Sequence, residues 1–164
     1  MKKKEIVSNA GPLIFLSILG KIHLLKRLFT TVYIPQAVFE EVVLTGKDRP
    51  GEKEITRGLE EGWLVKVKIK NKLAVEGMMG KLHRGETEAI VLAKELGNES
   101  VILDDLSSRE KARTMNLKVT GTIGILMLAK KEGVELNLRK ELDKLIEHGF
   151  RISEKLYQKI IAVK

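Results

Sequence analysis

Short runs of β-branched and apolar residues alternate with longer segments of helical periodicity along this chain. These runs predict strands near residues 4–8, 31–34, 63–68, 101–104 and 117–119. The third run, "WLVKVKI", alternates apolar and basic residues, which is typical of an edge strand with one solvated face. Because helical segments separate the strands, we predict an α/β fold with a mainly parallel sheet and helices on both faces.

Several helix ends carry recognisable signals. Pro35 is expected to occupy the first position of a helix over residues 35–43. Ser107 or Ser108 is expected to cap the helix over residues 107–115. These assignments matter for function because acidic residues lie in or beside both helices.

Length and composition predict one globular domain. The 164 residues are 43% hydrophobic and 32% charged, which is sufficient for a packed core in a single domain over residues 1–164. Residues from about 134 to 164 are expected to form closing C-terminal helices of that domain. The absence of Cys excludes disulfides and zinc–thiolate sites.

The charge balance bears on partners and compartment. Lys and Arg outnumber Asp and Glu by 30 to 22, a net charge of +8, which suits a polyanionic partner such as RNA but equally a Lys/Glu-rich surface. No apolar run approaches the roughly 18–20 residues that cross a bilayer. The first residues lead straight into a strand pattern without a signal peptide, so we expect a cytoplasmic protein with no membrane partner.

Polar side chains follow two of the predicted buried strands. In "EIVSNAGPLIFL" Ser8 and Asn9 end the first strand, and in "VILDD" Asp104 and Asp105 end the fourth. Ligands of parallel α/β sheets bind beyond the carboxyl ends of the strands. With Ser107 and its neighbour available as helix caps, one of the two aspartates is free for chemistry.

Three glutamates are further candidates. Glu86 opens the helix in "HRGETEAIVLA" and shares the buried face of that helix, whereas Glu88 lies on another face and is the weaker candidate. In "IPQAVFEEVV" Glu41 is expected to point inward more than Glu40. The alternative is that these acids complement helix dipoles or occupy solvated faces.

Carboxylates that converge on one sheet edge repel one another unless a cation is present. Mg²⁺ or Mn²⁺ removes that penalty and, with a bridging phosphate, activates water. An acidic metal cluster on a basic protein therefore predicts a nuclease.

These segments, together with "IVSNAGPLIFLSILGKIHLLKRLF" and "VTGTIGILMLAKKEG", resemble the PIN-domain family, specifically its VapC-like archaeal and bacterial branch. The resemblance covers nearly the whole core and rests on the order and spacing of the motifs. It implies a three-layer α/β/α sandwich with a five-stranded sheet. It also implies a metal-dependent ribonuclease, in many members a toxin paired with an antitoxin.

By resemblance, the catalytic carboxylates are Glu41, Glu86, Asp104 and Asp105. The resemblance places the metal ligands at Asn9, Glu41, Glu86 and Asp104, with Glu88 and Asp105 as second choices, and the metal as Mg²⁺ or Mn²⁺. Position 9 holds Asn where the family has an acid, and Ala10 lacks the hydroxyl that usually follows. An amide oxygen still suits a hard cation, but without the charge.

Alternatives follow from this departure. The protein is either a PIN-like ribonuclease or a catalytically weakened PIN module that binds RNA or a protein partner. A phospho-receiver-like domain also suits an Asp pair at a strand end, although position 9 is not acidic.

Expected partners are single-stranded or structured RNA, a possible antitoxin and a second copy of the chain. Part of the leucines of the first helices is expected to form a homodimer, because they exceed what one helix face buries; the alternative is full burial in the monomer core. These leucines are Leu16, Leu19, Leu24, Leu25 and Leu28.

Overall fold

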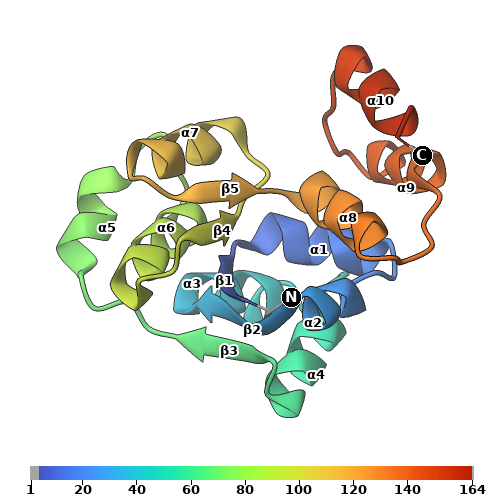
Figure 1. Ribbon diagram of the computed structural model, residues 1–164. Helices are drawn as coiled ribbons and strands as arrows, with labels where there is room; N and C mark the ends of the chain where they lie inside the picture. Colours follow the sequence, from blue (N-terminus) through green and yellow to red (C-terminus); the bar gives the residue numbers. More distant parts are fainter. Residues whose placement is uncertain (1–3, 164) are drawn as a thin grey trace.

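The computed structural model describes residues 4–163, and its centre is a five-stranded parallel sheet (Figure 1). The strand order is β3-β2-β1-β4-β5, so β3 and β5 form the edges. The strands are β1 (Lys4–Ser8), β2 (Phe29–Pro35), β3 (Leu64–Val67), β4 (Ser100–Ile102) and β5 (Lys118–Thr120). Each predicted strand is confirmed to within two residues at either end, and "WLVKVKI" supplies the predicted edge strand.

The alternation of side chains along the strands creates two hydrophobic cores. Ile6 packs with Ile102 on one face of the sheet, whereas Val7 packs with Val101 on the other. Successive residues of a strand point to opposite faces, so a strand that is apolar at every position needs helices on both sides. The three-layer α/β/α architecture follows.

The larger core lies under most of the helices. Side chains of α1 (Ala10–Ile18), α2 (His23–Leu28), α4 (Glu52–Glu61), α8 (Thr122–Lys131), α9 (Leu138–Glu147) and α10 (Glu154–Ile161) belong to it, together with α3 (Gln36–Phe39) and the π-helical turn η1 (Glu40–Leu44). The smaller core lies under α6 (Arg84–Leu96) and α7 (Leu106–Thr114), and α5 (Lys72–Met78) packs at its border.

The leucines of the first helices are buried within one copy of the chain. Leu16, Leu24 and Leu25 are fully buried and Leu19 nearly so, because α1 and α2 both pack against α8. Only Leu28 of that set is partly exposed. The excess of leucines is therefore absorbed by the monomer core, and the homodimer stays a prediction without support from these residues.

Some predicted helix details were wrong. Pro35 is the last residue of β2 and precedes α3, with extended backbone angles, rather than being its first helical residue. The cap of α7 is Asp105, whose Oδ2 accepts a hydrogen bond from the Ser108 amide at 3.0 Å, and not Ser107 or Ser108. Helix α5 was not predicted. Its cap Asn71 accepts a hydrogen bond from the Ala74 amide at 2.9 Å, which is a signal present in the sequence.

Candidate active site at the carboxyl edge of the sheet

The ends of β1 and β4 meet at the carboxyl edge of the sheet. Ser8 pairs with Ile102, and the Asn9 amide donates to the Ile102 carbonyl oxygen at 3.1 Å. Asn9 and Asp104 therefore emerge from neighbouring strands. A Cβ at Gly11, two residues beyond Asn9, would lie 3.9 Å from Asp104 Oδ2.

Asn9 carries an unpartnered oxygen. The residue is only 8% exposed, and its Oδ1 is buried without a hydrogen-bond partner within the part of the chain that the structure describes. A buried amide oxygen left without a donor is costly, by about 1–3 kcal/mol. A bound water or a hard cation would supply the missing partner, and an amide oxygen is a ligand that hard cations take.

Glu41 faces the same gap as Asn9. A Cβ at Gly85 would lie 3.2 Å from Asn9 Oδ1 and 3.4 Å from Glu41 Oε1, so glycine keeps the space between the two oxygens open. Glu41 lies on the π-helical turn η1, and such turns are frequent at functional sites. Burial of part of the side chain raises the pKa of Glu41, and the nearby His83 opposes the shift.

Glu86 is buried at the start of α6, with its carboxylate turned back toward the helix entry. Its Oε2 accepts a hydrogen bond from the His83 amide at 3.1 Å. Burial is the main cause that raises the pKa of Glu86, and the His83 amide opposes it. Asp105 and Glu41 raise that pKa further through charge repulsion, which indicates that the three carboxylates share one electrostatic environment.

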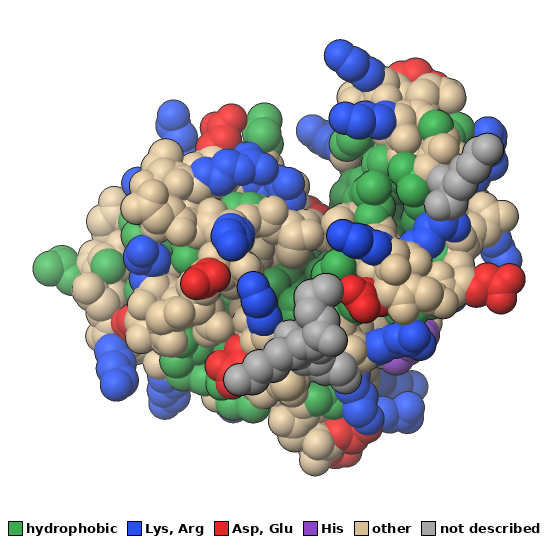
Figure 2. All heavy atoms as spheres, viewed as in Figure 1, with side chains coloured by type: hydrophobic (Ala, Val, Ile, Leu, Met, Phe, Trp, Pro, Cys, Tyr) green, Lys and Arg blue, Asp and Glu red, His purple; other side chains and the backbone are tan. Residues whose placement is uncertain are grey.

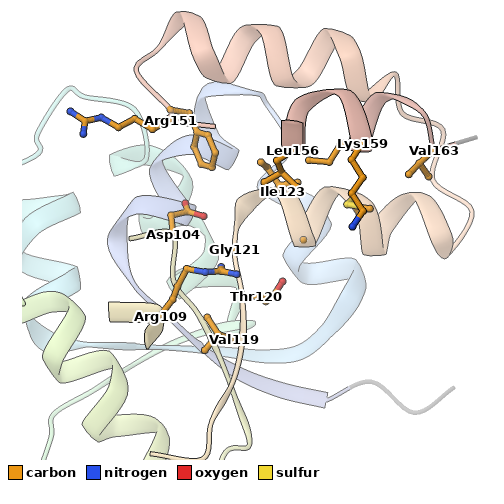
Figure 3. A pocket seen from close by; sticks show the side chains of 14 residues that line it. Asp104, Arg109, Val119, Thr120, Gly121, Ile123, Arg151, Leu156, Lys159 and Val163 are labelled. Carbon is orange, nitrogen blue, oxygen red and sulfur yellow. The ribbon is translucent and has the colours of Figure 1, made fainter. Parts of the chain in front are cut away.

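Asp104 is held by the first residue of α8. Its Oδ1 accepts a hydrogen bond from the Thr122 amide at 2.7 Å, and its Oδ2 accepts one from the Thr122 hydroxyl at 2.6 Å. Burial raises the pKa of Asp104, while these two bonds and the positive charge of Arg109 oppose the shift. Figure 3 shows Asp104 above the Arg109 guanidinium at the end of a cavity.

Gly121 allows the Asp104 carboxylate and the Arg109 guanidinium to lie close to the backbone before α8. A Cβ at this position would lie 2.6 Å from Asp104 Oδ1 and 2.9 Å from Arg109 Nη1, so only glycine fits. The Arg109 guanidinium is fixed by a hydrogen bond from Nη1 to the Leu103 carbonyl at 2.8 Å. A positive charge is thus positioned beside Asp104.

The two second-choice ligands already have structural partners. Glu88 is buried, and its Oε1 accepts a hydrogen bond from the Ala37 amide at 3.1 Å while its Oε2 lies 3.7 Å from Arg84. Glu88 therefore caps the start of α3, although the two lie far apart in the sequence. Asp105 caps α7 through Ser108 and is exposed, with its second oxygen left for another partner.

The candidate residues form two neighbouring groups. Asn9 and Glu41 face the gap at Gly85, with Glu86 in electrostatic contact with Glu41, whereas Asp104 lies with Thr122 and Arg109. Within residues 4–163, no group of three or more His, Asp or Glu side chains is gathered closely enough to hold a metal ion. The donors themselves fit a hard divalent cation: an orphaned amide oxygen and carboxylates whose pKa is raised by burial, a cost that a cation would relieve.

Two residues of this region were missed by sequence reasoning. Thr122 orients Asp104, and Arg109 lies beside it. Thr122 follows the last strand at the same sheet edge, so the rule that drew attention to Asp104 could have found it. Arg109 has no such signal, because its role depends on how α7 packs against the edge.

The sheet order and the polar residues at its carboxyl edge define a PIN-type fold, the fold of a class of nucleases. The DUF3368 family, described as a PIN domain, matches residues 5–163, and the chain belongs to this family. PIN domains generally use divalent metal ions. The phospho-receiver alternative is thereby set aside.

A solved structure supports the fold. It is a PilT N-terminus domain protein from the hyperthermophilic archaeon Sulfolobus solfataricus P2, with a TM-score of 0.57 and 20% identity over 80% of this chain and 98% of that chain. The comparison with curated proteins gives no match. Within residues 4–163, no helix is both long and apolar enough to cross a membrane.

Proposed function

We propose that this protein is a metal-dependent endoribonuclease that uses Mg²⁺ or Mn²⁺. The observation that carries the proposal is the buried, unpartnered Asn9 Oδ1 beside Glu41 Oε1 at the gap that Gly85 keeps open. Asn9, Glu41, Glu86 and Asp104 would hold the metal, and Asp105 would contribute its free oxygen from the margin. The net charge of +8 suits an RNA substrate.

The chain's own residues would have separate tasks. When bound, a divalent ion supplies an activated water and neutralises charge on the phosphate. Thr122 holds both oxygens of Asp104 in one orientation, so that this carboxylate needs little rearrangement on binding. Arg109, fixed by the Leu103 carbonyl, would attract a phosphate group and stabilise the negative charge that develops on it.

Cleavage of single-stranded RNA by the purified protein tests this function. We expect slow cleavage with Mn²⁺ or Mg²⁺, none with EDTA, and loss of activity in Glu86→Gln because the variant removes a charge that balances the ion. Glu60→Gln, at an exposed position of α4, is the matched control and should cleave like the wild type. Cleavage that continues in EDTA would contradict the proposal.

A second candidate function is a catalytically weakened PIN module that binds RNA or a protein partner. Two observations favour it: Asn9 brings no charge, and both Asp104 oxygens are already occupied by Thr122. RNA binding without cleavage, in the wild type and in Asn9→Asp alike, would support this function.

The proposal also includes a place in the cell. Membership of the VapC-like branch would make the protein the cytoplasmic toxin of a toxin–antitoxin pair, restrained by an antitoxin and active as a homodimer. Induced expression should then arrest growth, and Glu86→Gln should relieve the arrest. Light scattering tests the dimer, since a monomer has a mass of 18.4 kDa.

A further inference from the structure

A cavity of about 550 Å³ lies between α8 and α10, next to Asp104 (Figure 3). Its size is within the range of about 300–1,000 Å³ that small-molecule sites occupy. Its walls are the end of β5, one face of α8 and the facing side of α10. The space-filling view shows a hydrophobic hollow beneath the C-terminal helices, with Lys and Arg side chains around it (Figure 2).

The middle of this cavity is apolar. Ile123 and Met127 of α8 line one side, and Leu156 and Ile160 of α10 line the other. Leu156 is 44% exposed although it is a large apolar residue, because it faces the open cavity rather than a packed core. The surface between the two helices therefore favours an apolar or weakly polar group.

Positive charges lie at both ends of the apolar region. Lys159 extends from α10 toward α8 at one end, and Arg109 lies beside Gly121 and Asp104 at the other. Arg151 lines the cavity on the side of Asp104. Asp104 is the only acidic residue among the lining residues, and Arg109 and Arg151 both line the cavity near it, so this end keeps a net positive charge.

We propose that this cavity, named here the α8–α10 slot, holds one nucleoside of single-stranded RNA together with its two flanking phosphates. The base and sugar would contact the apolar side chains of α8 and α10. One phosphate would lie at Lys159 and the other at Arg109, beside Asp104. Charge complementarity carries this assignment, because two anionic groups separated by an uncharged one match two cationic ends separated by an apolar wall.

The inference deepens the proposed function and rests on it only for the cut, because the phosphate at Arg109 would be the one cleaved. Binding in the slot does not require metal or cleavage. RNA binding measured in EDTA therefore tests the slot alone, and RNA cleavage measured in Mn²⁺ tests the nuclease function.

The first test compares two lysines of the same helix. Binding of a short, fluorescein-labelled single-stranded RNA is measured by anisotropy in EDTA for the wild type, Lys159→Glu and Lys155→Glu. Lys159 lines the slot, whereas Lys155 is exposed on α10 and is not among the lining residues. We expect Lys159→Glu to weaken binding about tenfold, which is about 1.4 kcal/mol. It should also reduce the salt dependence by about one phosphate contact, while Lys155→Glu has little effect.

The second test fills the slot without changing charge. Leu156→Trp places a much larger side chain in the cavity and, by filling it, should weaken RNA binding several-fold. Leu73→Trp is the control, because Leu73 is 83% exposed on α5 and lies outside the cavity. Circular dichroism melts confirm that each variant is folded before binding is measured.

The outcomes separate the two proposals. Equal loss in Lys159→Glu and Lys155→Glu, unchanged binding in Leu156→Trp, or no RNA binding by the wild type in EDTA would overturn the slot. If the slot variants lose binding as expected but the wild type does not cleave RNA in Mn²⁺, the slot stands and the nuclease function fails. If RNA is cleaved but every variant binds alike, the nuclease function stands and the slot fails.

Discussion

Asn9 Oδ1 and Glu41 Oε1 face one gap beside Gly85, although Asn9 follows β1 and Glu41 lies on the π-helical turn η1. Neither residue could reach the other along the chain. They meet because α6 approaches the edge of the sheet, and because its second residue has no side chain. The gap is therefore a property of the packing of three elements rather than of any one motif.

Gly85→Ala should reduce function without unfolding the protein. The new methyl group would lie 3.2 Å from Asn9 Oδ1 and 3.4 Å from Glu41 Oε1, so it would occupy space that a bound cation needs. Ala also favours a helix over Gly by about 1 kcal/mol, which offsets the tight contacts. We expect the Mn²⁺ concentration needed for half-maximal activity to rise about tenfold or more, corresponding to about 1.4 kcal/mol.

Gly77→Ala is the matched control for this change. Gly77 lies on α5, and a Cβ there meets nothing within 4 Å. The variant should keep wild-type activity and gain some stability from the helix propensity of Ala. If both variants lose activity equally, the gap at Gly85 has no special role.

Asn9→Asp should raise activity and lower the metal requirement. The substitution adds a charge to an oxygen that is already buried beside Glu41. A ligand charge worth about 1.4 kcal/mol would increase metal affinity about tenfold. In EDTA the extra carboxylate should lower the melting temperature, because a buried charge would then face the Glu41 carboxylate without a cation. Mn²⁺ should restore the melting temperature and raise it above that of the metal-free wild type.

This stability measurement needs no RNA, so it separates metal binding from catalysis. A melting temperature of Asn9→Asp that does not respond to Mn²⁺ would mean that no cation binds at this gap. Activity of the variant would then be expected to stay at the wild-type level.

Glu88 and Glu86 should respond differently to the same substitution. Glu88→Gln keeps an oxygen that can accept the hydrogen bond from the Ala37 amide, so activity should stay close to that of the wild type. Glu88→Ala leaves that amide without its partner and should cost about 1–3 kcal/mol of stability, measured by urea unfolding. Glu86→Gln should abolish cleavage at unchanged fold. Loss of activity in Glu88→Gln would instead place Glu88 in the metal site.

The order of strands and helices along the chain could be predicted because local residue patterns indicate each element. Runs such as Ile6–Val7 and Val101–Ile102 are apolar at every position, which only a strand covered on both faces permits. The ends of elements were harder to predict. Asp105 rather than Ser107 caps α7, because both residue types are good caps and the choice depends on where the backbone leaves β4.

The candidate site was predictable only as a location. Carboxyl ends of parallel strands meet at one edge, so Asn9 and Asp104 could be expected there. The partners of each acid depend on helix packing, which periodicity does not describe. Glu88 is as buried as Glu86, yet its carboxylate caps α3. No spacing along α6 distinguishes a capping glutamate from a candidate metal ligand.

Thr122→Val should move the pH dependence of activity. Burial raises the pKa of Asp104, and the Thr122 hydroxyl and amide lower it again. Valine removes the hydroxyl donor at nearly the same size, so the pKa of Asp104 should rise further. Since cleavage requires the ionised carboxylate, the acidic limb of the profile of kcat/KM against pH should move to higher pH. Thr122→Ser keeps a hydroxyl and should leave the limb in place.

Stability should change with pH in a related way. A carboxyl group whose pKa is raised in the folded state binds its proton more tightly there than in the unfolded chain. Its contribution to stability is therefore fully present below the ordinary aspartate pKa and is lost as the pH rises through the folded-state pKa. In Thr122→Val this loss should continue to higher pH than in the wild type. Urea unfolding in EDTA should show a destabilisation that grows with pH toward about 1.5–3 kcal/mol, the contribution of one hydrogen bond to a charged group. A destabilisation that is the same at every pH would show that the Thr122 hydroxyl stabilises the fold without acting on the ionisation of Asp104.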